Sequence, residues 1–79
     1  MRTLVLKQKA LAHLTREGVV EALENGGYSD SEFTEVQFKG VTEKGQAIYE
    51  VRYYDNNTGL IDKGNVYVWE EDGLLKADY

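Results

Sequence analysis

The sequence of 79 residues contains neither cysteine nor proline. The absence of cysteine excludes a disulfide framework, a thiolate zinc site and a cysteine nucleophile. The absence of proline, together with the lack of low-complexity tracts and of fixed-period repeats, gives no sign of a linker or a solenoid. A chain of this length is expected to form a single domain over residues 1–79, stabilised by one hydrophobic core.

Long apolar runs are missing as well. The apolar run near the N-terminus, Leu4 to Leu6, is three residues long. The apolar part of a signal peptide needs about 7–15 residues, and a membrane-spanning helix needs about 20. We therefore expect a soluble, cytoplasmic protein that does not bind a membrane.

Positive charge is scarce, because nine lysines and arginines stand against 14 aspartates and glutamates, for a net charge of −5. Residues 1–16 hold four of the bases and no acid, whereas residues 17–79 hold all 14 acids and five bases, which gives +4 against −9. Affinity for nucleic acid depends on lysine and arginine replacing the counterions of the phosphates. Direct nucleic-acid binding is therefore not expected.

The apolar pattern changes its period once, near Gly26, and divides the chain into a helical segment, 1–27, and a sheet segment, 33–79. Apolar residues before the change recur at helical spacings, but in two groups of different phase. This indicates a break near Thr15, which would cap a helix over residues 16–25. The beginning of the chain, residues 2–6, is compatible with a first short helix or an edge strand, and the pattern favours the helix.

From Phe33 onward, β-branched and aromatic residues alternate with polar ones, as in strands that cover a core on one face. The pattern predicts strands over residues 33–42, 46–54, 65–70 and 74–79. Short glycine-containing turns between them indicate a meander. The predicted fold class is therefore α+β, with an N-terminal helix, or two short helices, packed on one face of a three- to four-stranded antiparallel meander.

Alternation also assigns side chains to the two faces of the sheet. In the second strand, Tyr49 and Val51 belong to the more apolar face, which the helix should cover, and Ile48 and Glu50 belong to the other. The third strand is ambiguous, since either its valines or its aromatic residues can face the core. The competing pairs are Val66 with Val68 and Tyr67 with Trp69.

Candidate catalytic and metal-binding patterns are weak. The single histidine, His13, lacks a neighbouring nucleophile with an orienting carboxylate, so we interpret it as a surface residue of a helix. Residues 55–62 resemble part of a calcium loop, but position twelve, which is a glutamate ligand in such loops, is Val66 here. A polar hairpin loop explains these residues better. The glycines form no phosphate-binding fingerprint. We therefore expect no enzyme activity, no catalytic residues, no metal and no cofactor.

Aromatic residues are abundant, with six tyrosines, one tryptophan and two phenylalanines. A core this small cannot bury all of them. The exposed ones are interpreted either as cross-strand pairs that stabilise the sheet or as a protein-binding hot spot rimmed by acids. The acidic run at residues 70–72 is explained most simply as a solvated strand end that prevents edge-to-edge pairing.

These features predict a non-enzymatic, acidic protein-binding module that docks on a basic or nucleic-acid-binding protein. In its sharper form, the carboxylates mimic the phosphate array of DNA or RNA, as in small phage-type or mobile-element inhibitors. The alternative is a homodimer whose aromatic sheet faces meet. The candidate partner-binding residues are Tyr54, Tyr67, Trp69, Glu50, Glu70, Glu71 and Asp72.

Overall fold

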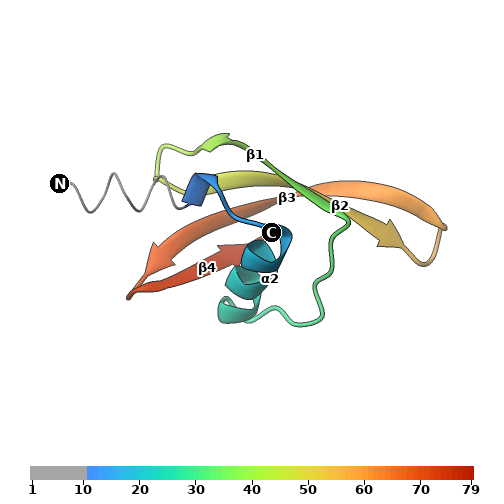
Figure 1. The fold of residues 1–79 in the computed structure, drawn as a ribbon, viewed down its shortest axis with the longest axis horizontal. Helices are drawn as coiled ribbons and strands as arrows, with labels where there is room; N and C mark the ends of the chain where they lie inside the picture. Colours follow the sequence, from blue (N-terminus) through green and yellow to red (C-terminus); the bar gives the residue numbers. More distant parts are fainter. Residues whose placement is uncertain (1–10) are drawn as a thin grey trace.

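The computed structural model describes residues 11–79, in which a helix packs on one face of a four-stranded antiparallel sheet (Figure 1). The strands lie in the sheet in chain order, so the topology is the meander predicted from the sequence. The α+β fold class is confirmed, and the prediction for residues 2–6 lies outside the described residues. The elements are α2 (Arg16–Asn25), β1 (Glu35–Val41), β2 (Ala47–Asp55), β3 (Leu60–Glu71) and β4 (Leu74–Asp78).

The helix α2 begins and ends where its capping residues predict. Leu11 and Ala12 are helical, but the helical conformation then ends, and Thr15, which has an extended backbone, caps α2. Its Oγ1 accepts a hydrogen bond from the backbone N–H of Gly18 at 3.1 Å. This bond satisfies one of the amides that lack a partner inside the helix. The break near Thr15 and the helix over residues 16–25 are therefore confirmed.

The C-terminal end of α2 lies directly against β4. A Cβ atom built on Gly26 would stand 2.3 Å from the carbonyl oxygen of Ala77. The side-chain amide of Asn25 also donates a hydrogen bond to the carbonyl of Leu75 at 2.9 Å. Glycine is required at position 26 because any side chain there would hold the helix away from the strand.

The core lies between α2 and the face of the sheet formed by alternate residues of each strand. The pairing of β2 with β3 places Val66 opposite Tyr49 and Val68 opposite Ala47. All four side chains are buried, so the valines of β3 face the helix and Tyr67 and Trp69 lie on the opposite, open face. The helix contributes buried side chains at Val19, Ala22 and Leu23.

The third strand is longer than predicted, because β3 starts at Leu60 rather than at residue 65. The added stretch contains Asp62, Lys63 and Gly64, which are poor strand formers. It is nevertheless held in the sheet because each residue from Leu60 to Gly64 pairs with a residue of β2. Backbone pairing with a regular neighbouring strand therefore overrides the local preference.

The hairpin of β2 and β3 extends beyond the rest of the sheet. The pairing of β1 with β2 ends at Arg52, and β4 pairs only with residues 67–71 of β3 (Figure 1). The hairpin loop is closed as predicted, with Gly59 at φ +75° and the side chain of Asp55 accepting a hydrogen bond from the amide of Asn57. Its tip exposes the apolar side chains of Tyr54, Leu60 and Ile61, of which Leu60 is 68% exposed.

Candidate functional site

Two of the predicted binding residues lie side by side on the open face. Tyr67 pairs across the strands with Ile48, and Trp69 follows two residues later on β3; all three side chains are half-buried. The indole N–H of Trp69 donates a hydrogen bond to Oε1 of Glu71 at 3.2 Å. The other oxygen of that carboxylate lies 3.8 Å from Nζ of Lys76. The indole is thus held in one orientation on the surface.

The carboxylate of Glu50 is on the same face but is already surrounded by positive charge. It lies 3.5 Å from Nζ of Lys39 and 3.8 Å from the guanidinium of Arg52. Its side chain is 20% exposed. A partner would therefore meet a compensated ion cluster at this position rather than a free negative charge.

The other predicted binding residues are elsewhere. Tyr54 pairs with Ile61, eight residues along β3 from Trp69, which corresponds to a distance of roughly 26 Å. Glu70 lies two residues after Val68 and therefore on the same, helix side of the sheet, and Asp72 occupies the turn between β3 and β4. The structure therefore brings together Tyr67, Trp69, Glu71 and Glu50 but distributes the remaining three over separate places.

Charge is divided between the two sides of the molecule. The open face carries four of the five basic residues in the stretch 17–79, next to acids that include Glu35, Glu50 and Glu71. The opposite side carries a series of acids on α2 and on the linker formed by residues 26–34. The bases are Lys39, Arg52, Lys63 and Lys76; the acids on the opposite side are Glu17, Glu21, Glu24, Asp30 and Glu32.

A groove runs between α2 and the linker, and we call it the helix groove. Its cavity volume is about 620 Å³. Val20 and Phe33 provide its apolar lining, and the carboxylates of Glu17, Glu21, Glu24 and Glu32 surround it. Arg16 is the one base at this groove among residues 11–79, and its guanidinium donates a hydrogen bond to the carbonyl of Thr34 at 3.2 Å. The groove thus combines a small apolar surface with a negative border.

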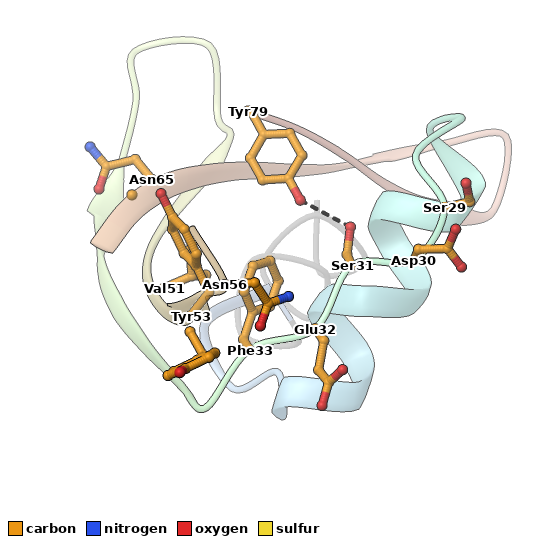
Figure 2. Close-up of a pocket in the computed structure, with 12 residues that line it drawn as sticks. Ser29, Asp30, Ser31, Glu32, Phe33, Val51, Tyr53, Asn56, Asn65 and Tyr79 are labelled. Atoms are coloured by element: carbon orange, nitrogen blue, oxygen red, sulfur yellow. Dashed lines mark hydrogen bonds between the residues drawn. The ribbon is translucent and has the colours of Figure 1, made fainter. Parts of the chain in front are cut away.

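A second hollow, which we call the tyrosine cavity, lies on the other side of the linker (Figure 2). Its volume is also about 620 Å³, and none of the described residues that line it is basic. Tyr79 approaches from the end of β4, Phe33 from the linker and Tyr53 from β2 (Figure 2). Ser31, Glu32 and Phe33 line both hollows, so the helix groove and the tyrosine cavity are neighbours across the linker.

The ring of Tyr79 is held in place by two contacts. Its hydroxyl is hydrogen-bonded to Oγ of Ser31 at 2.9 Å (Figure 2). Its ring packs edge to face on Tyr28, with the centroids 5.0 Å apart. The hydroxyl of Tyr28 in turn donates a hydrogen bond to the carboxylate of Asp78, and this bond raises the pKa of Tyr28. One wall of the tyrosine cavity is therefore preorganised.

The sequence-based prediction missed both hollows. The spacing of Glu17, Glu21 and Glu24 could have indicated an acidic stripe, because positions i, i+4 and i+7 share one face of a helix. The approach of the linker to Tyr53 and Tyr79 gives no local signal, since it depends on how α2 sits on β4. No group of three or more metal-ligating side chains occurs within residues 11–79, and no helix there is long and apolar enough to cross a bilayer.

A scan against protein-family models found no match, and searches of curated proteins and of solved structures found no significant similarity.

Proposed function

We propose that this protein is a non-enzymatic protein-binding module that docks on a basic protein through the side formed by α2 and the linker. The observation that supports this most is the helix groove, in which apolar side chains of Val20 and Phe33 lie among four carboxylates. Protein interfaces combine an apolar centre with a charged rim in the same way. The carboxylates would steer a basic partner, and the half-buried side chain of Val20 would lose its remaining exposure on contact.

The acidic stripe of α2 also supports the sharper form of the proposal, in which the protein mimics nucleic acid. Glu17, Glu21 and Glu24 follow one another along the helix at intervals of roughly 5–6 Å and are exposed. Glu32 and Asp30 continue the negative charge along the linker. A regular line of carboxylates along a helix is a geometry that phosphate-binding surfaces of a basic protein can accept.

The test is a capture experiment from cell lysate with two variants that lose the same charge. The triple variant Glu17→Gln, Glu21→Gln, Glu24→Gln removes the stripe, whereas Glu35→Gln, Glu43→Gln, Asp72→Asn removes three exposed acids elsewhere. We expect the first to lose a basic protein that the wild type and the second variant retain. Retention should also weaken as salt rises to physiological ionic strength, because exposed charges are screened.

Equal retention by both triple variants, or retention that salt does not change, would contradict the proposal. Because the substitutions are exposed and isosteric, circular dichroism should show an unchanged fold in both variants. The comparison therefore separates a specific role of the stripe from the general effect of net charge.

A second candidate function is a homodimer formed through the open face. It is favoured by the half-exposed pair Tyr67 and Trp69 and by the mixture of bases and acids around them, since a two-fold axis can bring unlike charges of two copies together. Sedimentation at increasing concentration tests it. A dimer that Trp69→Ala weakens, and that Tyr54→Ala at the distant hairpin tip does not, would support it; a strict monomer would exclude it.

A further inference from the structure

The tyrosine cavity has the composition of a site for an organic cation. The rings of the half-buried Tyr53 and the exposed Tyr54 and Tyr79 line it, together with the buried ring of Phe33. The face of an aromatic ring carries partial negative charge and attracts a cation that lies over it. Within the part of the chain that the structure describes, no basic side chain of the lining competes for these rings.

The carboxylates near the cavity add a negative potential without filling the cavity. Asp30 and Glu32 line its rim, both are exposed, and their carboxylates are directed away from the ring of Tyr79 (Figure 2). In this position they attract a cation towards the opening and leave the space between the rings free. The long side chain of Glu32 has the rotamer freedom to turn towards a bound cation and accept a hydrogen bond from it.

The shape and the polar groups favour a planar cation over a compact one. A guanidinium group stacks flat on aromatic rings and offers several N–H donors in its plane. The side-chain amide of Asn56 lies at the same hollow (Figure 2) and supplies a carbonyl oxygen that can accept from such donors. A volume of about 620 Å³ is ample for one arginine side chain and the backbone that carries it.

We propose that the tyrosine cavity binds the guanidinium end of an arginine side chain that belongs to the basic protein docked on the neighbouring helix groove. This inference rests on the proposed function, which supplies the arginine. The two hollows share Ser31, Glu32 and Phe33, so a protein bound in the helix groove lies next to the cavity. The acidic stripe then provides the charge attraction, and the cavity selects arginine at one position of the partner.

The experiment uses the whole protein and small probes, so it does not depend on the partner. N-acetyl-arginine methylamide is titrated into ¹⁵N-labelled protein while amide shifts are recorded, and N-acetyl-citrulline methylamide serves as the neutral isostere. We expect saturable shifts at residues 29–33, 51–54 and 64–65 with the arginine probe alone. A dissociation constant on the order of millimolar is expected for a single side chain.

Matched variants locate the site. Tyr53→Leu removes a ring from the cavity and should weaken binding by about three- to tenfold, whereas Tyr67→Leu removes a ring from the open face and should have no effect. Glu32→Gln should weaken it by about two- to threefold, because one exposed charge is lost. Asp30 has φ +60°, so Asp30→Asn is the appropriate neutral variant there, since asparagine tolerates this conformation.

A third probe, N-acetyl-lysine methylamide, is titrated in the same way. The inference is overturned if the citrulline probe shifts the same amides equally, if the lysine probe binds as tightly as the arginine probe, or if Tyr67→Leu weakens binding as much as Tyr53→Leu. Should Tyr53→Leu fail to fold, the exposed variant Glu32→Gln still decides. Absence of arginine binding, combined with loss of the basic partner from the α2 triple variant, would reject the cavity and leave the proposed function intact. The reverse result would reject the proposed function, and with it the origin of the arginine, but would leave the cavity as a guanidinium site.

Discussion

The hydroxyl of Tyr49, a fully buried side chain of β2, donates a hydrogen bond to the carbonyl oxygen of Leu11. The same hydroxyl accepts a bond from the backbone N–H of Leu14 at 3.0 Å. These two bonds satisfy one backbone carbonyl and one backbone amide in the segment that precedes α2. One tyrosine therefore fixes the position of this segment on the sheet.

The first prediction concerns this hydroxyl. Tyr49→Phe keeps the ring but leaves the carbonyl of Leu11 and the amide of Leu14 without their partner. We expect a loss of about 1–3 kcal/mol in the free energy of unfolding, measured by urea denaturation. Tyr53→Phe, in the same strand and half-buried, is the control and should change stability by much less. Equal losses in the two variants would show that the bonds of Tyr49 contribute little.

The second prediction concerns alkaline pH. Burial raises the pKa of Tyr49 above its ordinary value of 10.0, so the folded state keeps the proton at a pH where the unfolded chain releases it. The stability that this group contributes is complete below pH 10 and is lost as the pH rises from there towards the folded pKa. The free energy of unfolding should therefore fall above pH 10.

The difference between the wild type and Tyr49→Phe isolates this effect from the other tyrosines and the lysines. Urea denaturation at a series of pH values should show a steeper alkaline loss for the wild type. Tyr28→Phe gives a comparison at an exposed hydroxyl whose pKa is raised by Asp78. Parallel curves for the wild type and Tyr49→Phe would contradict the prediction.

A third prediction concerns the contact between α2 and β4. Gly26→Ala places a methyl group 2.3 Å from the carbonyl oxygen of Ala77, so the helix end must move, and we expect a loss of about 2 kcal/mol or more. Gly18→Ala, inside α2, meets only ordinary contacts of 3.4 Å and beyond. It should raise stability by about 0.5 kcal/mol. Thermal denaturation distinguishes the two, and a stable Gly26→Ala protein would disprove the close approach.

A fourth prediction tests the start of α2. Thr15→Ala removes the oxygen that accepts from the amide of Gly18 and should cost about 1 kcal/mol, whereas Thr15→Ser retains the acceptor and should cost little. Circular dichroism during urea denaturation measures both. Indistinguishable midpoints for the alanine and serine variants would mean that the hydroxyl does not act as the cap.

Much of the fold could be predicted because its signals are local. Thr15 and the glycines after Asn25 mark the two ends of α2. Strict alternation in β2 assigns Tyr49 and Ile48 to opposite faces of the sheet. The choice between Val68 and Trp69 could not be made within β3 alone, since it is set by the register against β2. In this register the valines lie opposite Ala47 and Tyr49, which fill the space under α2.

The candidate sites were harder to predict for the same physical reason. The predicted binding residues are aromatic side chains expected to be exposed on the sheet and acids expected at their rim. Alternation along β3, however, places the adjacent acids Glu70 and Glu71 on opposite faces. The two hollows arise from the path of the linker past Phe33 and from the approach of Tyr79 to Ser31 across 48 positions of the chain. Contacts of this range leave no periodic signal in the sequence.

The overhanging hairpin gives the tyrosine cavity walls of unequal stiffness. Ser31 and Phe33 belong to the linker, which is anchored to the folded body, whereas Tyr53 and Asn56 belong to the part of the hairpin that only its own two strands stabilise. Backbone amides of this part should exchange with deuterium faster than those around Val66, because two-stranded ribbons open at lower free energy. The cavity can then widen or narrow by bending of the hairpin while α2 and the core remain intact.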